Sequence, residues 1–389
     1  INGKVFAAND VMLNGGKVTV GKNGGIMAGI NENKMSVMNS NQQAETLFNQ
    51  LVNTDNLNLG NEFSSSNGNI YIKSNQRIDN AGVDISGTVK NFGKGNTEIR
   101  STGIDGVKIA GTVSNADGLL KINNNWGDVN ISGTVKNNGT TQIFNVPGEG
   151  KATFTVDGQI YTYQLDTNNG INISGNVDTK GDLTINNTGD KGINISGVVN
   201  NDGNLSIQNG ISGNSETAKT RNNRTDALNI TGTVNNTGNA TILNEAKGGL
   251  KIGNTGRVSN SNGKLAMTNN GQGGFTVENE GVVKGNSTDG FSSDIEMINN
   301  KGAFDINGQV IGDGGQMELT NNGTEFNING KVAQNANGVG DGETRVGGDV
   351  YITNNNGNLN INGAIEGKNV QHTTNITNNG NALNISESG

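Results

Sequence analysis

The stretch Leu183-Thr-Ile185-Asn-Asn187, followed by Gly192-Ile193-Asn-Ile195-Ser-Gly197-Val-Val199, decides the fold of this chain. It contains two phrases, apolar-x-apolar-x-Asn and apolar-x-Ile-x-Gly-x-Val. The first phrase begins again at Leu205, 22 residues after Leu183. Apolar and polar residues alternate within each phrase, which is the periodicity of a β-strand. Asn-Gly, Asn-Asn and Gly-Gly pairs bound the phrases and indicate turns.

Both phrases recur along most of the chain. Copies of the second phrase are Val83–Val89, Val107–Val113, Val129–Val135, Ile171–Val177, Ile193–Val199 and Leu228–Val234, with degraded forms at Phe154–Ile160, Phe304–Val310, Phe326–Val332 and Leu359–Ile365. Equal spacing is required when each coil stacks on the one before, whereas an antiparallel meander has no such requirement. Parallel connections are right-handed. We therefore predict an all-β, right-handed parallel β-helix (β-solenoid) with about 22 residues and three short strands per coil.

Stacked coils bring equivalent residues into columns. The Ile and Val of the second phrase are predicted to fill the core. The Gly between them is predicted to occupy a corner with positive φ, at Gly87, Gly111, Gly133, Gly175, Gly197, Gly232, Gly308 and Gly330. The Asn that closes the first phrase is predicted to form an amide ladder, a structural role favoured over a ligand role, at Asn187, Asn209, Asn244, Asn269, Asn299, Asn321, Asn354 and Asn378.

Composition narrows the function. The chain has 389 residues, with 62 Gly, one Pro and no Cys, and 31% of its residues are hydrophobic. This low fraction of hydrophobic residues fits a fold whose hydrophobic core is narrow along its whole length. The net charge of −8 does not indicate the positively charged surface that binds nucleic acid. No Cys means no disulfide and no thiolate metal site, and we expect no cofactor.

Residues 1–80 follow the repeat poorly, and 81–389 carry the regular coils with loop insertions. The head contains Val5-Phe6-x-x-Asn9 and ends in Val18-x-Val20-Gly21. In these residues, up to residue 30, it resembles the N-terminal secretion domain of filamentous-haemagglutinin-like exoproteins of the two-partner secretion pathway. The Pro and Gly of the family phrase are absent, and Asp10 follows Asn9. The resemblance implies a secreted or cell-surface bacterial protein, an outer-membrane transporter as partner during export, and a β-helical passenger.

One segment of the head has helical spacing. Within residues 42–52, Leu47, Phe48, Leu51 and Val52 lie on one face. We predict a short helix that caps or flanks the solenoid, with a partner-binding helix as the alternative.

The chain offers no set of residues for catalysis, so we expect no enzymatic activity. Asp289, Asp294 and Glu296 form a loose acidic group, predicted to face solvent, and the lone His372 cannot build a metal site alone. Trp126, Tyr161 and Tyr163 are candidates for stacking on sugars.

Function on a solenoid tends to lie where the repeat is interrupted. Such interaction loops are expected at Gly210–Asp226 (with Arg221 and Arg224), Val146–Thr167, Lys284–Asp294, Ala333–Gly348 and Lys368–Thr373. Three functions remain open: an adhesin that binds a receptor or glycan on host or bacterial surfaces, a fibre subunit that associates end to end or laterally, and a polysaccharide-degrading enzyme. Fold alone cannot separate them.

Overall fold

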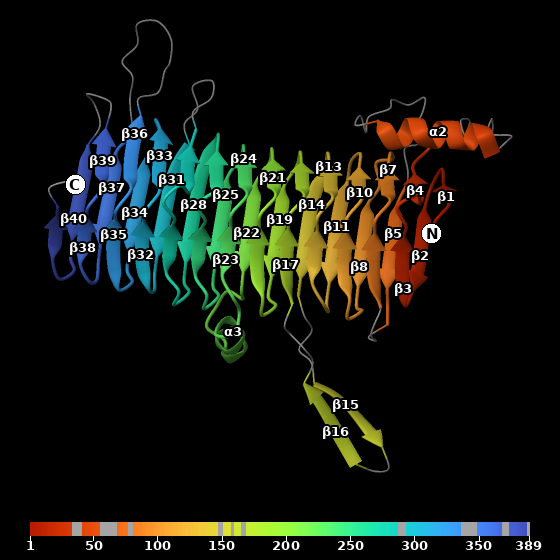
Figure 1. Cartoon of the computed structure of the whole chain (residues 1–389), viewed down its shortest axis with the longest axis horizontal. Coiled ribbons are helices and arrows are strands. Elements are labelled where there is room, and N and C mark those ends of the chain that lie inside the picture. Colours follow the sequence, from red (N-terminus) through yellow and green to blue (C-terminus); the bar gives the residue numbers. More distant parts are fainter. Residues whose placement is uncertain are drawn as a thin grey trace, which may run out of the picture. The chain divides into compact units, whose positions relative to one another are not determined.

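The computed structural model describes residues 1–32, 41–54, 68–76, 81–146, 151–156, 159–164, 169–286, 293–335, 348–367 and 373–386. Its strands form three parallel sheets of thirteen strands each, and every coil contributes one strand to each sheet (Figure 1). The fold is a right-handed parallel β-helix, which confirms the prediction from the repeat. The chain divides into two compact units, residues 1–184 and 185–389, which are treated separately below.

The strands of each sheet share one position in the coil. Sheet A contains β1 (Lys4–Phe6), β4 (Gly25–Ala28), β7 (Thr88–Asn91), β10 (Thr112–Asn115), β13 (Thr134–Asn137), β18 (Asn176–Thr179), β21 (Val198–Asn201), β24 (Thr233–Asn236), β27 (Arg257–Asn260), β30 (Val282–Gly285), β33 (Gln309–Asp313), β36 (Lys331–Asn335) and β39 (Ala364–Gly367). Sheet B contains β2 (Val11–Gly15), β5 (Ile70–Ser74), β8 (Thr97–Ser101), β11 (Leu119–Asn124), β14 (Thr140–Asn145), β19 (Leu183–Asn187), β22 (Leu205–Asn209), β25 (Ala240–Asn244), β28 (Gly263–Asn269), β31 (Ser293–Asn299), β34 (Met317–Asn321), β37 (Val350–Asn354) and β40 (Thr374–Asn378). Sheet C contains β3 (Lys17–Val20), β6 (Gly82–Ile85), β9 (Gly106–Ile109), β12 (Val129–Ile131), β17 (Gly170–Ile173), β20 (Gly192–Ile195), β23 (Leu228–Ile230), β26 (Leu250–Ile252), β29 (Phe275–Val277), β32 (Ala303–Ile306), β35 (Glu325–Ile328), β38 (Leu359–Ile361) and β41 (Leu383–Ile385).

The core of each unit is a set of stacked apolar columns. In residues 1–184, Ile85, Ile109, Ile131 and Ile173 are successive register partners in sheet C, and all four are buried. In residues 185–389 the neighbouring sheet C column changes from aliphatic to aromatic. The Phe275 and Phe304 rings stack with centroids 5.1 Å apart, and those of Phe304 and Phe326 with centroids 4.5 Å apart. Coils inside the stack therefore bury their few apolar side chains against the equivalent residues of the next coil, whereas Leu383 and Ile385 of the last described coil are exposed.

The glycines of the second phrase do not serve the purpose predicted for them. All eight lie in described coils, and none has a positive φ. They are needed because stacked corners approach too closely for a side chain: a Cβ on Gly232 would lie 2.0 Å from the carbonyl oxygen of Gly197, and one on Gly330 would lie 2.0 Å from that of Gly308. The prediction of positive φ is wrong. Glycine is required at these positions because neighbouring coils leave no space for a side chain.

The segment Phe154–Ile160 was predicted to be a degraded copy of the second phrase, and this is wrong. Its described residues, 154–156 and 159–160, belong to β15 (Lys151–Val156) and β16 (Gln159–Gln164), which pair antiparallel with each other and with no strand of the three sheets. Period-two alternation is common to all strands, so it does not distinguish a coil strand from a hairpin strand.

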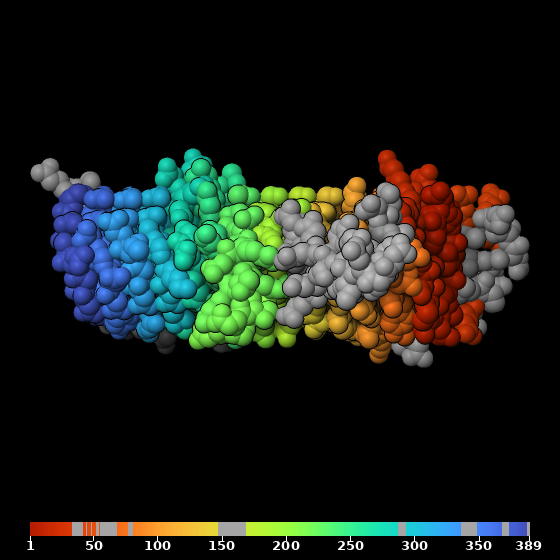
Figure 2. Space-filling view, turned by 90° about the horizontal axis from the view of Figure 1, so that it is seen from below, coloured from red at the N-terminus to blue at the C-terminus, as the bar shows by residue number. Residues whose placement is uncertain are grey.

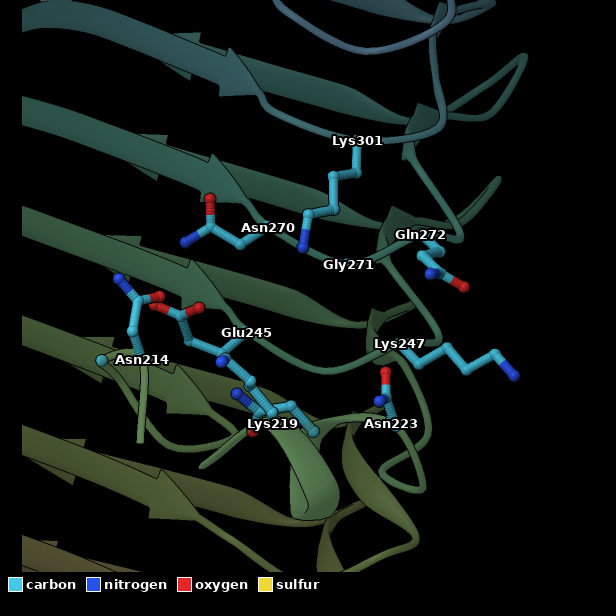
Figure 3. A pocket seen from close by; sticks show the side chains of 11 residues that line it. Asn214, Lys219, Asn223, Glu245, Lys247, Asn270, Gly271, Gln272 and Lys301 are labelled. Carbon is cyan, nitrogen blue, oxygen red and sulfur yellow. The ribbon is translucent and has the colours of Figure 1, made fainter. Parts of the chain in front are cut away.

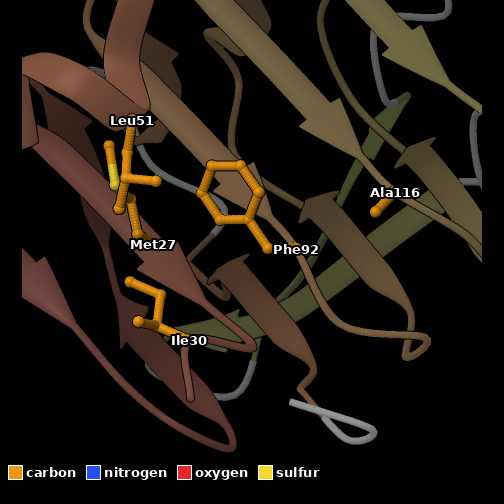
Figure 4. Close-up of a cluster of buried hydrophobic side chains, with 5 residues drawn as sticks. All are labelled: Met27, Ile30, Leu51, Phe92 and Ala116. Carbon is orange, nitrogen blue, oxygen red and sulfur yellow. The ribbon is translucent and has the colours of Figure 1, made fainter. Parts of the chain in front are cut away.

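The head of the chain takes part in the same three sheets through β1 to β5. Helix α2 (Asn41–Asn53) occupies the segment with helical spacing. Leu51 is buried with Met27, Ile30, Phe92 and Ala116, and Leu47 is partly buried against them (Figure 4). The side chains of Phe48 and Val52 lie outside the described residues.

Lys90 fixes the end of this helix. Its side chain is 3% exposed, and its Nζ donates to the carbonyl oxygens of Leu51 and Thr54, both at 2.9 Å. A cation is favourable there because a helix C-terminus carries partial negative charge. Met27 and Lys90 are register partners in sheet A, so α2 flanks that sheet. No helix in the described part of the chain is long and apolar enough to cross a membrane.

Candidate functional site

The insertion at residues 210–226 is the predicted interaction loop that the structure describes throughout. It follows β22 and lengthens its coil, so that Asn209 and its partner Asn244 are 35 residues apart. It contains α3 (Glu216–Asn222), which lies on the face shown in Figure 2, within the green segment. The other four predicted loops include residues 147–150, 157–158, 165–168, 287–292, 336–347 or 368–372, which lie outside the described residues, as does His372.

Local interactions explain why α3 forms. Ser215 is the N-cap, and its hydroxyl accepts a hydrogen bond from the Ala218 backbone N–H at 3.1 Å. Glu216 lies in the first turn, where a negative charge is favourable. Ala218 and Arg221 are the buried residues of the helix.

The two predicted arginines have different environments. Arg221 is 8% exposed, so the prediction that it belongs to an exposed interaction surface is wrong. It lies on the inner side of a helix whose polar outer side faces solvent, and sequence alone did not show that orientation. Arg224 is more exposed, and its guanidinium lies 3.7 Å from the carboxylate of Asp190.

A side-chain amide closes the insertion on itself, and a backbone hydrogen bond holds it against the next coil. The Asn222 side chain accepts from Ile211 N–H and donates to Ile211 O, both at 2.8 Å. The Lys247 N–H of the following coil donates to Asn222 O at 2.8 Å. The helix is therefore fixed to the corner that follows β25.

A pocket of about 320 Å³ lies between α3 and the corners of three following coils (Figure 3). The insertion supplies Asn214, Lys219, Asn222 and Asn223. The coil corners supply Glu245, Lys247, Asn270, Gln272 and Lys301. In Figure 3 the Lys301 amine points toward Asn270 and Gly271, Glu245 lies beside Asn214, and Lys247 extends away from the others.

The charges of this pocket are unequal, with three lysines against one glutamate. Lys219 is paired with Glu216 on the same helix at 2.9 Å. Glu245 accepts a hydrogen bond from the Ser212 hydroxyl at 3.4 Å. Among the described residues, no carboxylate forms an ion pair with Lys247 or Lys301. The pocket therefore presents two unneutralised cations together with amide donors and acceptors.

The predicted asparagines occupy one column, here called the inner ladder, which is buried except at its last member, Asn378: Asn187, Asn209, Asn244, Asn269, Asn299, Asn321, Asn354 and Asn378. Each Nδ2 donates to the Oδ1 of the next member at 2.8–3.0 Å. The same Nδ2 also bonds the turn, for example from Asn269 to Gly271 O at 2.9 Å. The ladder thus holds the corners that carry the pocket at a fixed spacing.

Sequence reasoning missed several further sets of stacked amides, of which two are described here. A second buried column in sheet A includes Asn201, Asn236 and Asn260, joined at 2.7 and 2.8 Å. The signal was present, because these asparagines follow the core valine by two residues and so point inward too. The second set, here called the outer ladder, follows the inner one by one residue and consists of Asn270, Asn300, Asn322, Asn355 and Asn379.

The other predicted site residues do not join the pocket. Tyr161 and Tyr163 lie on β16, and their side chains are outside the described residues. Trp126 is 6% exposed, so its ring face is not available for stacking on a sugar. Glu296 is paired with Lys264 at 2.9 Å, Asp294 accepts from Gln316 N–H at 2.8 Å, and Asp289 is outside the described residues.

The described residues contain no group of three or more His, Cys, Asp or Glu side chains that could hold a metal ion. Two groups among the described residues, neither of them lining the pocket, have shifted pKa values. The hydrogen bond and charge of Lys251 lower the pKa of Glu278, with help from the Asn254 N–H. The hydrogen bond to Asp349 raises the pKa of Tyr351.

Comparison of the chain with protein-family models, with curated proteins and with solved structures finds no match. The resemblance of the head to two-partner exoproteins therefore stays a prediction from Val5, Phe6, Asn9 and the Val18–Gly21 segment.

Proposed function

We propose that this chain is part of a secreted or cell-surface bacterial adhesin, exported through an outer-membrane transporter, whose β-helix presents binding sites at interrupted coils. The observation that carries the proposal is the pocket beside α3. A stack of coils with repeating hydrogen-bonded corners supports the insertion at residues 210–226, and this insertion creates a polar, partly cationic depression. Preformed sites on rigid elements suit recognition.

We propose binding rather than catalysis at this pocket. Hydrolysis of glycosides by the common two-carboxylate route needs a pair of carboxyl groups flanking the bond. Glu245 is the one carboxylate among the residues lining the pocket. A panel of polysaccharides incubated with the chain tests this point, and cleavage that is abolished by Glu245→Gln would overturn it.

Attachment is tested with beads coated with the chain and applied to epithelial cells and to bacterial cells. We expect the coated beads to bind at least one of these surfaces. Beads coated with heat-denatured chain serve as the control. Equal attachment of native and denatured chain, or attachment of neither, would contradict the adhesin proposal.

A second function, a self-assembling fibre subunit, is favoured by a different observation. On the outer side of sheet C, Asn327, Asn360 and Asn384 are joined in one column at 2.7 Å. Asn307, Asn329 and Asn362 are joined beside it at 2.8 and 2.9 Å. The six asparagines carry no charge, although Asp305 accepts from Asn327 at 2.8 Å at the N-terminal end of the first column, and a second copy would match the period of the array.

Sedimentation velocity and negative-stain images test this second function. Concentration-dependent bundles that are dispersed by Asn329→Lys would support lateral assembly. Single particles at all concentrations would exclude it.

A further inference from the structure

We propose that the pocket beside α3 binds an acidic saccharide residue, a sugar ring that bears an anionic group. This inference deepens the proposed attachment function and rests on it for its biological meaning. The binding itself depends only on the pocket.

The anionic group is assigned to the side of the pocket formed by Lys301. Its side chain is exposed, it has no ion-pair partner among the described residues, and its amine points toward Asn270 and Gly271 (Figure 3). Lysine presents a compact charge with three donors, which suits a carboxylate or a sulfate. Lys247 also lines the pocket and has no ion-pair partner among the described residues, although its side chain extends away from the other lining residues in Figure 3.

The hydroxyl groups of the sugar are assigned to the opposite side. Glu245 would repel an anion but accepts strongly from hydroxyl donors. Asn214 lies beside it in Figure 3, and Asn270 lies between Glu245 and Lys301. Amides both donate and accept, so they suit a ring whose hydroxyls do the same. The pocket thus distinguishes two ends of its ligand, one anionic and one hydroxylated.

The lining argues against an apolar ligand and for modest affinity. None of the residues lining the pocket is aromatic or aliphatic beyond the lysine stems. Its volume of about 320 Å³ lies at the small end of ligand sites. Binding through hydrogen bonds and exposed charges is screened by salt. We therefore expect weak, salt-sensitive binding of a terminal sugar, which many copies on one surface would strengthen.

The experiment titrates the chain, followed by NMR or calorimetry, with glucuronic acid, glucose 6-sulfate, glucose and acetate. We expect binding of at least one acidic sugar, with glucose and acetate each about tenfold weaker or undetectable. The two acidic sugars reveal whether a carboxylate or a sulfate is preferred. Glucose or acetate binding as tightly as the acidic sugars would overturn the proposal, and so would binding of neither acidic sugar.

Lys301→Met is expected to weaken acidic-sugar binding about tenfold, the effect of losing one charge-assisted hydrogen bond. Lys264→Met is the matched control, because it removes an exposed lysine of the same unit that pairs with Glu296 outside the pocket. An equal loss in both variants would mean that general charge, not the pocket, attracts the sugar, and would overturn the assignment.

The two proposals fail separately. If Lys301→Met abolishes sugar binding but coated beads attach as before, adhesion uses another surface and the saccharide site stands. If the wild-type chain binds the sugar but its beads attach to no cell, the adhesin proposal fails alone. If beads attach but no acidic sugar binds, the saccharide proposal fails alone.

Discussion

Asn321 and Asn322 are neighbours in sequence, yet one belongs to the inner ladder and the other to the outer ladder. Asn321 is fully buried and donates to Asn354 at 2.9 Å. Asn322 is exposed and donates to Asn300 at 2.7 Å. The two side chains make hydrogen bonds of the same kind and of similar length, so the bond itself does not separate the ladders. Their burial does.

This difference in burial indicates which of the two ladders contributes more to the stability of the fold. Water replaces a lost hydrogen bond at the surface, whereas a buried amide that loses its partner stays unsatisfied. The ladders also run in opposite directions. Inner members donate toward the C-terminus, as Asn321 does to Asn354, and outer members donate toward the N-terminus, as Asn355 does to Asn322. The side-chain dipoles of neighbouring ladders therefore oppose each other.

The largest effect is expected from Asn321→Leu. The substitution removes the side-chain partner of the Asn354 Oδ1 and of the Gly323 N–H, and one of the two acceptors of the Asn299 Nδ2, which keeps Gly302 O at 3.1 Å. We expect the free energy of unfolding to fall by about 3 kcal/mol. The measurement is chemical denaturation followed by circular dichroism, with hydrogen exchange to locate the loosened coils.

Asn322→Leu is the matched control, with the same change one residue away. We expect a loss within about 0.5 kcal/mol, as for most surface substitutions. If both variants lose the same stability, burial is not what distinguishes the ladders, and the comparison fails.

A smaller effect tests the spacing on which both ladders depend. Gly308 lies in the coil of Asn299 and Gly330 in the coil of Asn321, and a Cβ on Gly330 would lie 2.0 Å from Gly308 O. Gly330→Ala is expected to force these coils apart and to lower the free energy of unfolding by about 2 kcal/mol. Gly3→Ala, where the new Cβ meets nothing within 4 Å, serves as the control. Equal stability of Gly330→Ala and the wild type would show that coil spacing is not limiting.

The columns of Ile, Val and Asn were predictable because stacking repeats each side chain at a fixed interval, and burial demands the same chemistry each time. The repeat therefore showed the coil and the inner ladder together. The outer ladder was not predictable in this way. An exposed Asn such as Asn322 is also favoured by the turn that follows it, so its type does not reveal whether it stacks.

The pocket was predictable only in its location. The interruption at residues 210–226 indicated where a site could lie. Which residues line it depends on how the corners after β25, β28 and β31 align beside α3, and this brings Glu245, Lys247 and Lys301 together from different coils. Arg221 was predicted to be an interaction residue because it is a charged residue in a loop, but it lies on the buried face of α3.

A third prediction concerns the ion pair between Glu278 and Lys251 and tests whether its charge stabilises the fold although the pair is partly exposed. Glu278 is paired with Lys251, and its Oε2 accepts from Asn254 N–H at 2.9 Å. Its pKa is lowered from 4.5. A depressed folded-state pKa stabilises the fold above the unfolded value, and this stability is lost as the pH falls through the folded pKa.

Glu278→Gln should therefore cost about 0.5 kcal/mol at pH 7, the size expected for a partly exposed pair. The stability difference from the wild type should shrink below pH 4.5. Urea denaturation of both proteins at several pH values measures it. A difference that stays constant into strong acid would show that the Lys251 contact does not act through the charge of Glu278.

The smallest expected effect is the coupling between two outer-ladder amides. A double-mutant cycle on Asn300 and Asn322, each changed to Ala, isolates their 2.7 Å hydrogen bond. We expect a coupling of about 0.3 kcal/mol, at the low end for cross-strand pairs, because water competes for both amides. The same cycle on Asn299 and Asn321 should give at least about 1 kcal/mol, since their 3.0 Å bond is buried. Equal coupling in the two cycles would mean that exposed amide stacking stabilises the coils as much as buried stacking does, and the surface array would then contribute to the fold itself.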